Sequence, residues 1–138
     1  MNKVYMMSDG FLQREQGGSY VGRISIEHID LSPIEGVYFK EKGKNYLWLY
    51  RRPVLEYDET TMSYKKRQSN PYWEVYLEKT KGEEGIAYRG HFFFLRFKYN
   101  IVGIWDKTLG DIQHRLNLYV DRAPSNEQTI INRIRDGK

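Results

Sequence analysis

The segment YWEVYLEK, residues 72–79, has the clearest alternation of apolar and polar side chains in the chain. In an extended strand, successive side chains point to opposite faces. Trp73, Val75 and Leu77 therefore share one face, and the tyrosines and glutamates between them share the other. This period of two is typical of a half-buried β-strand. We expect Trp73, Val75 and Leu77 to lie in the core.

Several other segments predict short strands bounded by polar or glycine-containing turns. They are residues 20–29, two hairpins at 36–50 and 54–67, the aromatic segment 88–105, and residues 115–120. Residues 9–20, by contrast, predict a turn-rich loop. No two strands are separated by a crossover helix of adequate length, which favours antiparallel pairing. We predict an all-β or β-rich α+β fold, a single antiparallel barrel or sandwich of about seven or eight short strands.

A C-terminal helix is predicted over about residues 125–135. Ser125 and Gln128 have the spacing of a capping box, in which each side chain bonds to the backbone at the other's position. The apolar stripe that should dock on the sheet consists of Ile130, Ile131 and Ile134. Since the chain contains no linker or repeat, we expect residues 1–138 to form one domain with this helix at its end.

Composition limits the classes of protein to be considered. The chain has 138 residues, no cysteine and a formal net charge of +4. Without cysteine it can form neither disulfides nor thiolate metal sites, which fits a reducing compartment. No apolar run approaches the ~20 residues of a membrane span, and the first ten residues lack the apolar stretch of a secretory signal. We expect a cytoplasmic protein that has no membrane partner.

The most aromatic segment, YRGHFFFLRFKYNIVGIW (88–105), is predicted to be one long strand. Its odd positions are uniformly apolar and are expected to face the core; they are Phe93, Leu95, Phe97, Tyr99 and Ile101. Its even positions are two rings followed by two cations, namely Phe92, Phe94, Arg96 and Lys98. Burying two unpaired cations is costly, so this second face should be at least half exposed, or its rings covered by the helix or a loop.

Tyrosines of neighbouring strands extend this mixed face into a predicted binding surface. Rings on such a surface stack bases, and lysine or arginine neutralises phosphates, so the surface predicts binding of nucleic acid, especially single strands. The predicted ligand-binding residues are Tyr72, Tyr76, Phe92, Phe94, Arg96, Lys98 and Tyr119, with the basic cluster Lys65, Lys66 and Arg67. Glu74 and Glu78 lie on the same face and disfavour a uniformly basic groove.

The same residue types also predict a surface for a protein partner, because tyrosine, tryptophan and arginine are enriched in protein interfaces. In that alternative the chain is an accessory protein of a phage or mobile element, an inhibitor or an assembly protein. The oligomeric state is left open by the sequence.

Two local resemblances concern nucleic acids. RGHFFFLRF (89–97) resembles the strand motif of RNA-recognition domains, but it departs from that motif at several positions and the chain lacks the two helices of that fold. GVYFKEKGKNYLW (36–48) resembles the opening hairpin of GIY-YIG nucleases, although its second half lacks the family's glycine. The second resemblance implies a metal-dependent nuclease whose basic residue is Arg51 or Arg52 and whose metal-binding carboxylate is Glu74 or Glu78.

No other pattern in the sequence indicates catalysis. The chain contains no Walker loop, nucleophile elbow or dinucleotide fingerprint. Its three histidines, His28, His91 and His114, are not spaced as metal ligands in sequence. We therefore predict a small binding module with no catalytic residue, no bound metal and no cofactor, and the metal-dependent nuclease is the least favoured alternative.

Overall fold

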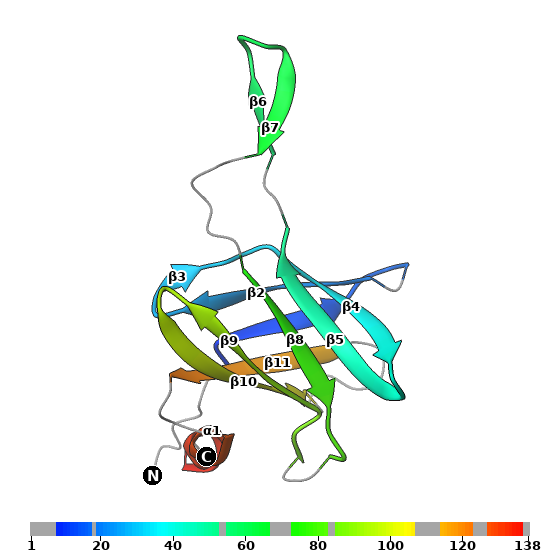
Figure 1. Ribbon diagram of the computed structural model, residues 1–138, viewed down its shortest axis with the longest axis vertical. Helices are drawn as coiled ribbons and strands as arrows, with labels where there is room; N and C mark the ends of the chain where they lie inside the picture. The colour runs from blue at the N-terminus through cyan, green and yellow to red at the C-terminus, as the bar shows by residue number, and fades with distance from the viewer. Residues whose placement is uncertain are drawn as a thin grey trace.

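The strands and the helix of the computed structural model follow one another in a simple order (Figure 1). The structure describes residues 8–17, 19–52, 55–66, 73–82, 85–106, 114–122 and 127–136. The elements are β1 (Gly10–Arg14), β2 (Tyr20–Ile26), β3 (Ile29–Asp30), β4 (Ile34–Glu41), β5 (Lys44–Arg51), β6 (Leu55–Asp58), β7 (Ser63–Lys66), β8 (Glu74–Lys79), β9 (Tyr88–Phe94), β10 (Phe97–Trp105), β11 (Arg115–Arg122) and α1 (Glu127–Asp136).

Eight of these strands form a closed antiparallel barrel in the order β1-β11-β10-β9-β8-β5-β4-β2, and pairing of β1 with β2 closes the ring. Strands that follow one another along the chain are neighbours in the barrel, so the topology is up-and-down. The two-residue strand β3 extends the sheet beside β2, and α1 is the C-terminal helix. The predicted fold class, an antiparallel barrel or sandwich with a C-terminal helix, is confirmed, and of the two alternatives the chain forms the barrel.

Strand β1 lies within the segment that was predicted to be a loop, so that prediction is wrong for residues 10–14. Leu12 is fully buried in the barrel, and this burial stabilises the strand. Glycines allow β1 and β2 to lie very close together: a Cβ atom at Gly22 would lie 1.7 Å from the carbonyl oxygen of Phe11. The strand was missed because Gly17 and Gly18, which follow it, indicated a turn-rich loop for the whole segment 9–20.

The barrel interior is filled by side chains. An eight-stranded barrel is just wide enough either to be filled or to hold one small ligand. Trp73, Val75 and Leu77 are at most 2% exposed, as predicted. They pack in one buried cluster with residues of all eight barrel strands, among them Leu12, Ile24, Ile34, Leu47, Phe92, Ile101 and Leu116. The described interior is therefore a packed core, and a ligand would have to bind on the outside or at the barrel ends.

The aromatic segment is a hairpin and not one long strand, so the predicted register was wrong. A two-residue turn at Leu95 and Arg96 separates β9 from β10, and Phe94 lies opposite Phe97. Side chains opposite each other on paired strands share a face. The core side chains are therefore at even positions in β9, before the turn, and at odd positions in β10, after it. The assignment from Tyr99 onward was right, because Tyr99 and Ile101 are buried.

Before the turn the two faces are the reverse of the prediction. Phe93 is 71% exposed, whereas Phe92 and Phe94 are buried. Leu95, in the turn itself, is 59% exposed. Phe97 lies on the core face opposite Phe94, as predicted, but at the start of β10 it is 42% exposed. Phe92 packs edge-on against Trp73 and stacks on Tyr99, with ring centroids 5.4 Å apart in both pairs.

Helix α1 docks on the outside of the barrel (Figure 1). Ile130 and Ile131 are buried in a second cluster with Ile86, Val102 and Tyr119, and Ile134 packs against its edge. This confirms the predicted docking of the apolar stripe. Ser125 of the predicted cap lies outside the described residues. Among the described residues, no helix is long and apolar enough to cross a membrane.

Strands β6 and β7 form the predicted second hairpin as a separate two-stranded sheet. Figure 1 shows this hairpin extending away from one end of the barrel. We refer to residues 55–66 as the arm. One of its two faces carries Leu55, Tyr57 and Tyr64, which are 51–69% exposed.

Candidate functional site

The structure does not bring the predicted binding residues together on one surface. Phe92 and Phe94 face the core because the β9–β10 turn reverses the predicted faces. Tyr119 points outward from β11, but α1 covers it and leaves it only 8% exposed. The prediction that these three rings are accessible is therefore wrong.

The remaining predicted residues lie in three separate places. Tyr76 is 51% exposed on the outer face of β8, and Arg96 and Lys98 are exposed at the tip of the β9–β10 hairpin. Lys65 lies on the arm, where its ammonium group is 3.0 Å from the carboxylate of Asp58. The residues Tyr72 and Arg67 and the side chain of Lys66 lie outside what the structure describes.

A cluster of rings covers the outer face of three neighbouring strands. We call it the ring face; it consists of Phe39 on β4, Tyr46, Trp48 and Tyr50 on β5, and Tyr76 on β8. The strand register assembles it, because Phe39 lies opposite Tyr46 and Trp48 lies opposite Tyr76. The Trp48 and Tyr76 rings are nearly parallel at 6.0 Å, and Trp48 and Tyr50 lie 4.4 Å apart.

The ring face was missed although the sequence contained its signal. In NYLWLY (45–50), Tyr46, Trp48 and Tyr50 alternate with Leu47 and Leu49. Both leucines are fully buried, so the larger rings must point outward. A cluster of rings on an outer face, here half-buried except for Tyr76, is the less common outcome, because large aromatic side chains are usually found in the core.

Carboxylates lie among these rings, and each is held by a donor. The indole nitrogen of Trp48 donates to Glu74 at 3.0 Å, and the Lys44 ammonium lies 3.5 Å from Glu78. Glu35 accepts a hydrogen bond from the Tyr50 hydroxyl and lies 2.5 Å from the Arg52 guanidinium. The hydrogen bond to Glu35 is the main cause that raises the pKa of Tyr50 above its ordinary value.

Next to the ring face, the outer side of the β9–β10 hairpin is basic. We call it the basic hairpin; its outward residues are Arg89, His91 and Phe93 on β9, Arg96 in the turn, and Lys98 and Asn100 on β10. None of these described positions is a carboxylate. Arg89 lies opposite Glu78 of β8, so the basic hairpin continues the sheet that carries the ring face.

A groove of about 520 Å³ lies on the other side of the ring face. Its apolar part is lined by Tyr20, Val21, Pro33, Val37 and Tyr50, and its charged part by Glu15, Glu35 and Arg52. Because Tyr50 belongs to both surfaces, the groove is an extension of the ring face toward β2.

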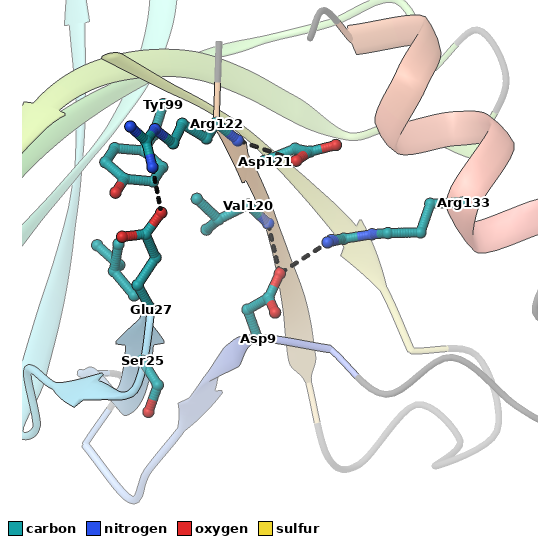
Figure 2. A pocket seen from close by; sticks show the side chains of 9 residues that line it. Asp9, Ser25, Glu27, Tyr99, Val120, Asp121, Arg122 and Arg133 are labelled. Atoms are coloured by element: carbon teal, nitrogen blue, oxygen red, sulfur yellow. Dashed lines mark hydrogen bonds and ion pairs between the residues drawn. The ribbon is translucent and has the colours of Figure 1, made fainter. Parts of the chain in front are cut away.

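A smaller pocket of about 230 Å³ lies where α1 meets the barrel (Figure 2). Asp9 accepts hydrogen bonds there from the backbone N–H of Val120 at 2.6 Å and from the Arg133 guanidinium at 2.9 Å. Glu27 lies 3.4 Å from Arg122 on the opposite wall. These charged groups already have partners in the protein, so the arrangement fastens α1 and β11 to the barrel.

The resemblance to GIY-YIG nucleases gains no support from the site. Within the described residues, no group of three or more histidine, aspartate or glutamate side chains could hold a metal ion. Tyr38, from the resemblance to the GIY-YIG hairpin, points toward the barrel end, where its ring contacts Tyr20 at 5.2 Å and Tyr88 at 6.1 Å. Glu74, the candidate metal ligand, accepts the hydrogen bond of Trp48.

The function must therefore be inferred from this geometry, because no protein-family model, curated protein or solved structure matches the chain.

Proposed function

We propose that the ring face and the basic hairpin together bind single-stranded nucleic acid. The observation that carries this proposal is their adjacency: the exposed ring of Tyr76 on β8 lies beside a hairpin face whose described residues include cations and no carboxylate. Non-specific binders of single strands combine rings for base stacking with cations that follow the phosphates. The proposal retains three of the residues predicted from sequence, Tyr76, Arg96 and Lys98.

Base stacking is assigned to the exposed rings at the middle of this surface. Tyr76 is 51% exposed and Phe93 is 71% exposed, so both have ring surface available to a base. Trp48 lies parallel to Tyr76 and supports it from the side. Stacking on such a ring contributes roughly 1–3 kcal/mol per base.

Phosphate contacts are assigned to Arg96 and Lys98, which are exposed at the hairpin tip. Lys98 lies opposite Phe93 on the paired strand, so a stacked base and a neutralised phosphate would be neighbours. Glu35 on β4 would repel phosphates despite its hydrogen bond, and so would Glu74 and Glu78 on β8, although they are paired with Trp48 and Lys44. The nucleic-acid backbone is therefore placed over β9 and β10, away from these acids.

Titration of a labelled oligonucleotide at about 50 and 200 mM salt tests this function. Tyr76→Ala should weaken binding by roughly fivefold or more at both salt concentrations, because stacking is largely independent of salt. Lys98→Gln should instead reduce the salt dependence by about one phosphate contact. Lys65→Gln is the matched control, since Lys65 lies on the arm beside Asp58. The proposal is wrong if the wild-type chain does not bind at the lower salt concentration.

A protein partner is the second candidate function, and the arm favours it. Leu55, Tyr57 and Tyr64 on one arm face, and Met62 at its tip, are 51–78% exposed. An isolated two-stranded hairpin is marginally stable in water, so an apolar face on it gains much from being covered. Sedimentation of the wild type and of Tyr57→Ser/Tyr64→Ser over a range of concentrations tests the simplest partner, a second copy of the chain. A sedimentation coefficient that stays at the value of the monomer at every concentration excludes that partner.

A further inference from the structure

The turn between β9 and β10 has a leucine, Leu95, at a position with a positive φ angle. Leu95 and Arg96 have φ angles of 49° and 74°, which is the left-handed conformation at both central positions of a two-residue hairpin turn. Turns of this type strongly prefer Asn-Gly, Asp-Gly or Gly-Gly. A leucine with positive φ is a genuine outlier, since its Cβ atom crowds the following carbonyl group.

The fold buries less than half of the Leu95 side chain, so packing offers little to compensate for this strain. Its side chain is 59% exposed at the tip of the hairpin, and it belongs to neither buried cluster of the described residues. A strained residue that gives little stability in return points to a function for its side chain.

The surroundings of Leu95 indicate the chemistry of what it contacts. Phe93 and Phe97 are also exposed, at 71% and 42%, so three large apolar side chains share the tip. Cations accompany them: Arg96 is in the turn itself, and Lys98 lies opposite Phe93. The Arg122 guanidinium lies 3.3 Å from the centre of the Phe97 ring, but it is already paired with Glu27. An apolar tip flanked by positive charge fits a target that is apolar inside and anionic at its edge.

We propose that Leu95 is a wedge that enters an opened base step where a single strand joins a duplex. This proposal rests on the proposed function. Apolar side chains, including leucine, insert between base steps in other nucleic-acid-binding proteins, and flanking cations contact the phosphates on either side. The tip lies at the end of the basic hairpin, so a single strand that leaves the junction continues onto Phe93 and Tyr76.

The junction is favoured over a continuous single strand for a geometric reason. A single strand can reach the exposed ring of Phe93 without displacing any base, so it does not need a protruding leucine. At a junction the terminal base pair loses one stacking neighbour, and an apolar side chain can cover its exposed face. The substrate class is therefore a duplex with a single-stranded extension.

The test compares the affinity for an oligonucleotide with a duplex–single-strand junction to that for its single strand alone. We expect the wild type to prefer the junction at least about fivefold, the lower end of what one stacked base contributes. Leu95→Asn keeps every cation and suits the turn, so it should remove that preference and retain single-strand binding. Leu95→Met is the matched control, since it keeps an apolar side chain, and it should retain the preference. A 2-aminopurine base placed at the junction should become brighter with the wild type and not with Leu95→Asn.

The outcomes separate the two proposals. Equal affinity of the wild type for both oligonucleotides, or an unchanged preference in Leu95→Asn, contradicts the wedge and leaves single-strand binding intact. No binding to either oligonucleotide contradicts the proposed function and the wedge with it. Binding of the wild type to vesicles that contain anionic lipid, lost in Leu95→Asn while no oligonucleotide binds, would assign the tip to a lipid surface and overturn the wedge.

Discussion

The β4–β5 and β9–β10 hairpins close with the same backbone geometry but with very different residues. Lys42 and Gly43 have φ angles of 50° and 79°, and Leu95 and Arg96 have 49° and 74°. Gly43 adopts its conformation without strain, and a Cβ atom there would meet no neighbour within 4 Å. The first turn thus has the preferred glycine at its second position, whereas the second turn has none of the preferred residues at either position. The comparison teaches that the second turn is specified by something other than its own stability.

The two ends of β10 differ in a related way. At one end Val102 is buried beneath α1, and at the other Phe97 is exposed next to the strained turn. Packing against α1 therefore stabilises β10 at one end, and the exposed residues at its other end need not contribute to stability. Substitutions at the two ends should have correspondingly unequal effects.

The largest expected effect distinguishes adjacent rings of β9. Phe92→Ala should lower the free energy of unfolding by about 3–5 kcal/mol, because it leaves a cavity between Trp73 and Tyr99. Phe93→Ala, one residue away on the exposed face, should change it by less than about 0.5 kcal/mol. Urea denaturation of both variants measures the difference. Similar losses in the two variants would contradict the observed faces of β9.

The helix end of β10 should show the next largest effect. Ile130 is fully buried against the barrel, so Ile130→Ala should cost about 2–4 kcal/mol. Asn132→Ala, on the exposed side of α1, is the control and should be close to neutral. Denaturation monitored by tryptophan fluorescence gives both values. If Ile130→Ala unfolds like the wild type, α1 does not contribute to the stability of the barrel.

Substitutions in the two turns should change the free energy of unfolding by about 1 kcal/mol, in opposite directions. Leu95→Asn should raise stability by roughly 0.5–1 kcal/mol, since asparagine tolerates the left-handed conformation. Gly43→Ala should lower it by about 1 kcal/mol through conformational strain alone, because the site has open space. Thermal melting temperatures of the two variants should therefore move apart. A decrease for Leu95→Asn would mean that Leu95 makes a stabilising contact.

The smallest effect concerns Tyr38, whose contact with Tyr88 joins the two hairpins at the barrel end. Burial is the main cause that raises the pKa of Tyr38 above its ordinary value of 10. As pH rises past 10, the unfolded chain loses the Tyr38 proton before the folded chain does, so the free energy of unfolding falls. Well below pH 10 both states keep this proton, so Tyr38 causes no change of stability with pH there. Tyr38→Phe should flatten the alkaline decline, measured by urea denaturation at about pH 9 and pH 11. An unchanged decline would place its cause in other tyrosines.

The features that the sequence predicted correctly share a physical basis. Period-two alternation identified the core faces of β2, β8 and β11, and the glycine of the β4–β5 turn marked that hairpin. These signals are local, and they decided the fold class. The apolar stripe of α1 identified the helix in the same way.

The candidate site could not be predicted as well, because it depends on where the chain turns. Leu95 and Arg96 have none of the residues that mark a hairpin, so β9 and β10 were joined and the rings of β9 were assigned to the wrong face. Tyr119 points outward as predicted, but only the tertiary fold reveals that α1 covers it. The ring face depends on the pairing of β5 with β8, and these two strands are separated in the sequence by the arm.

Closure of the barrel has a consequence for how the protein is made. Asp9 and Val120, which join β1 and β11 at the seam, are 111 residues apart. A ribosome adds roughly 5–20 residues per second, so β1 presents an unpaired backbone edge for about five seconds or more before β11 emerges. During synthesis the nascent chain is an open sheet that can pair with another open sheet. The yield of folded protein should therefore depend on translation speed and on chaperones that shield exposed edges.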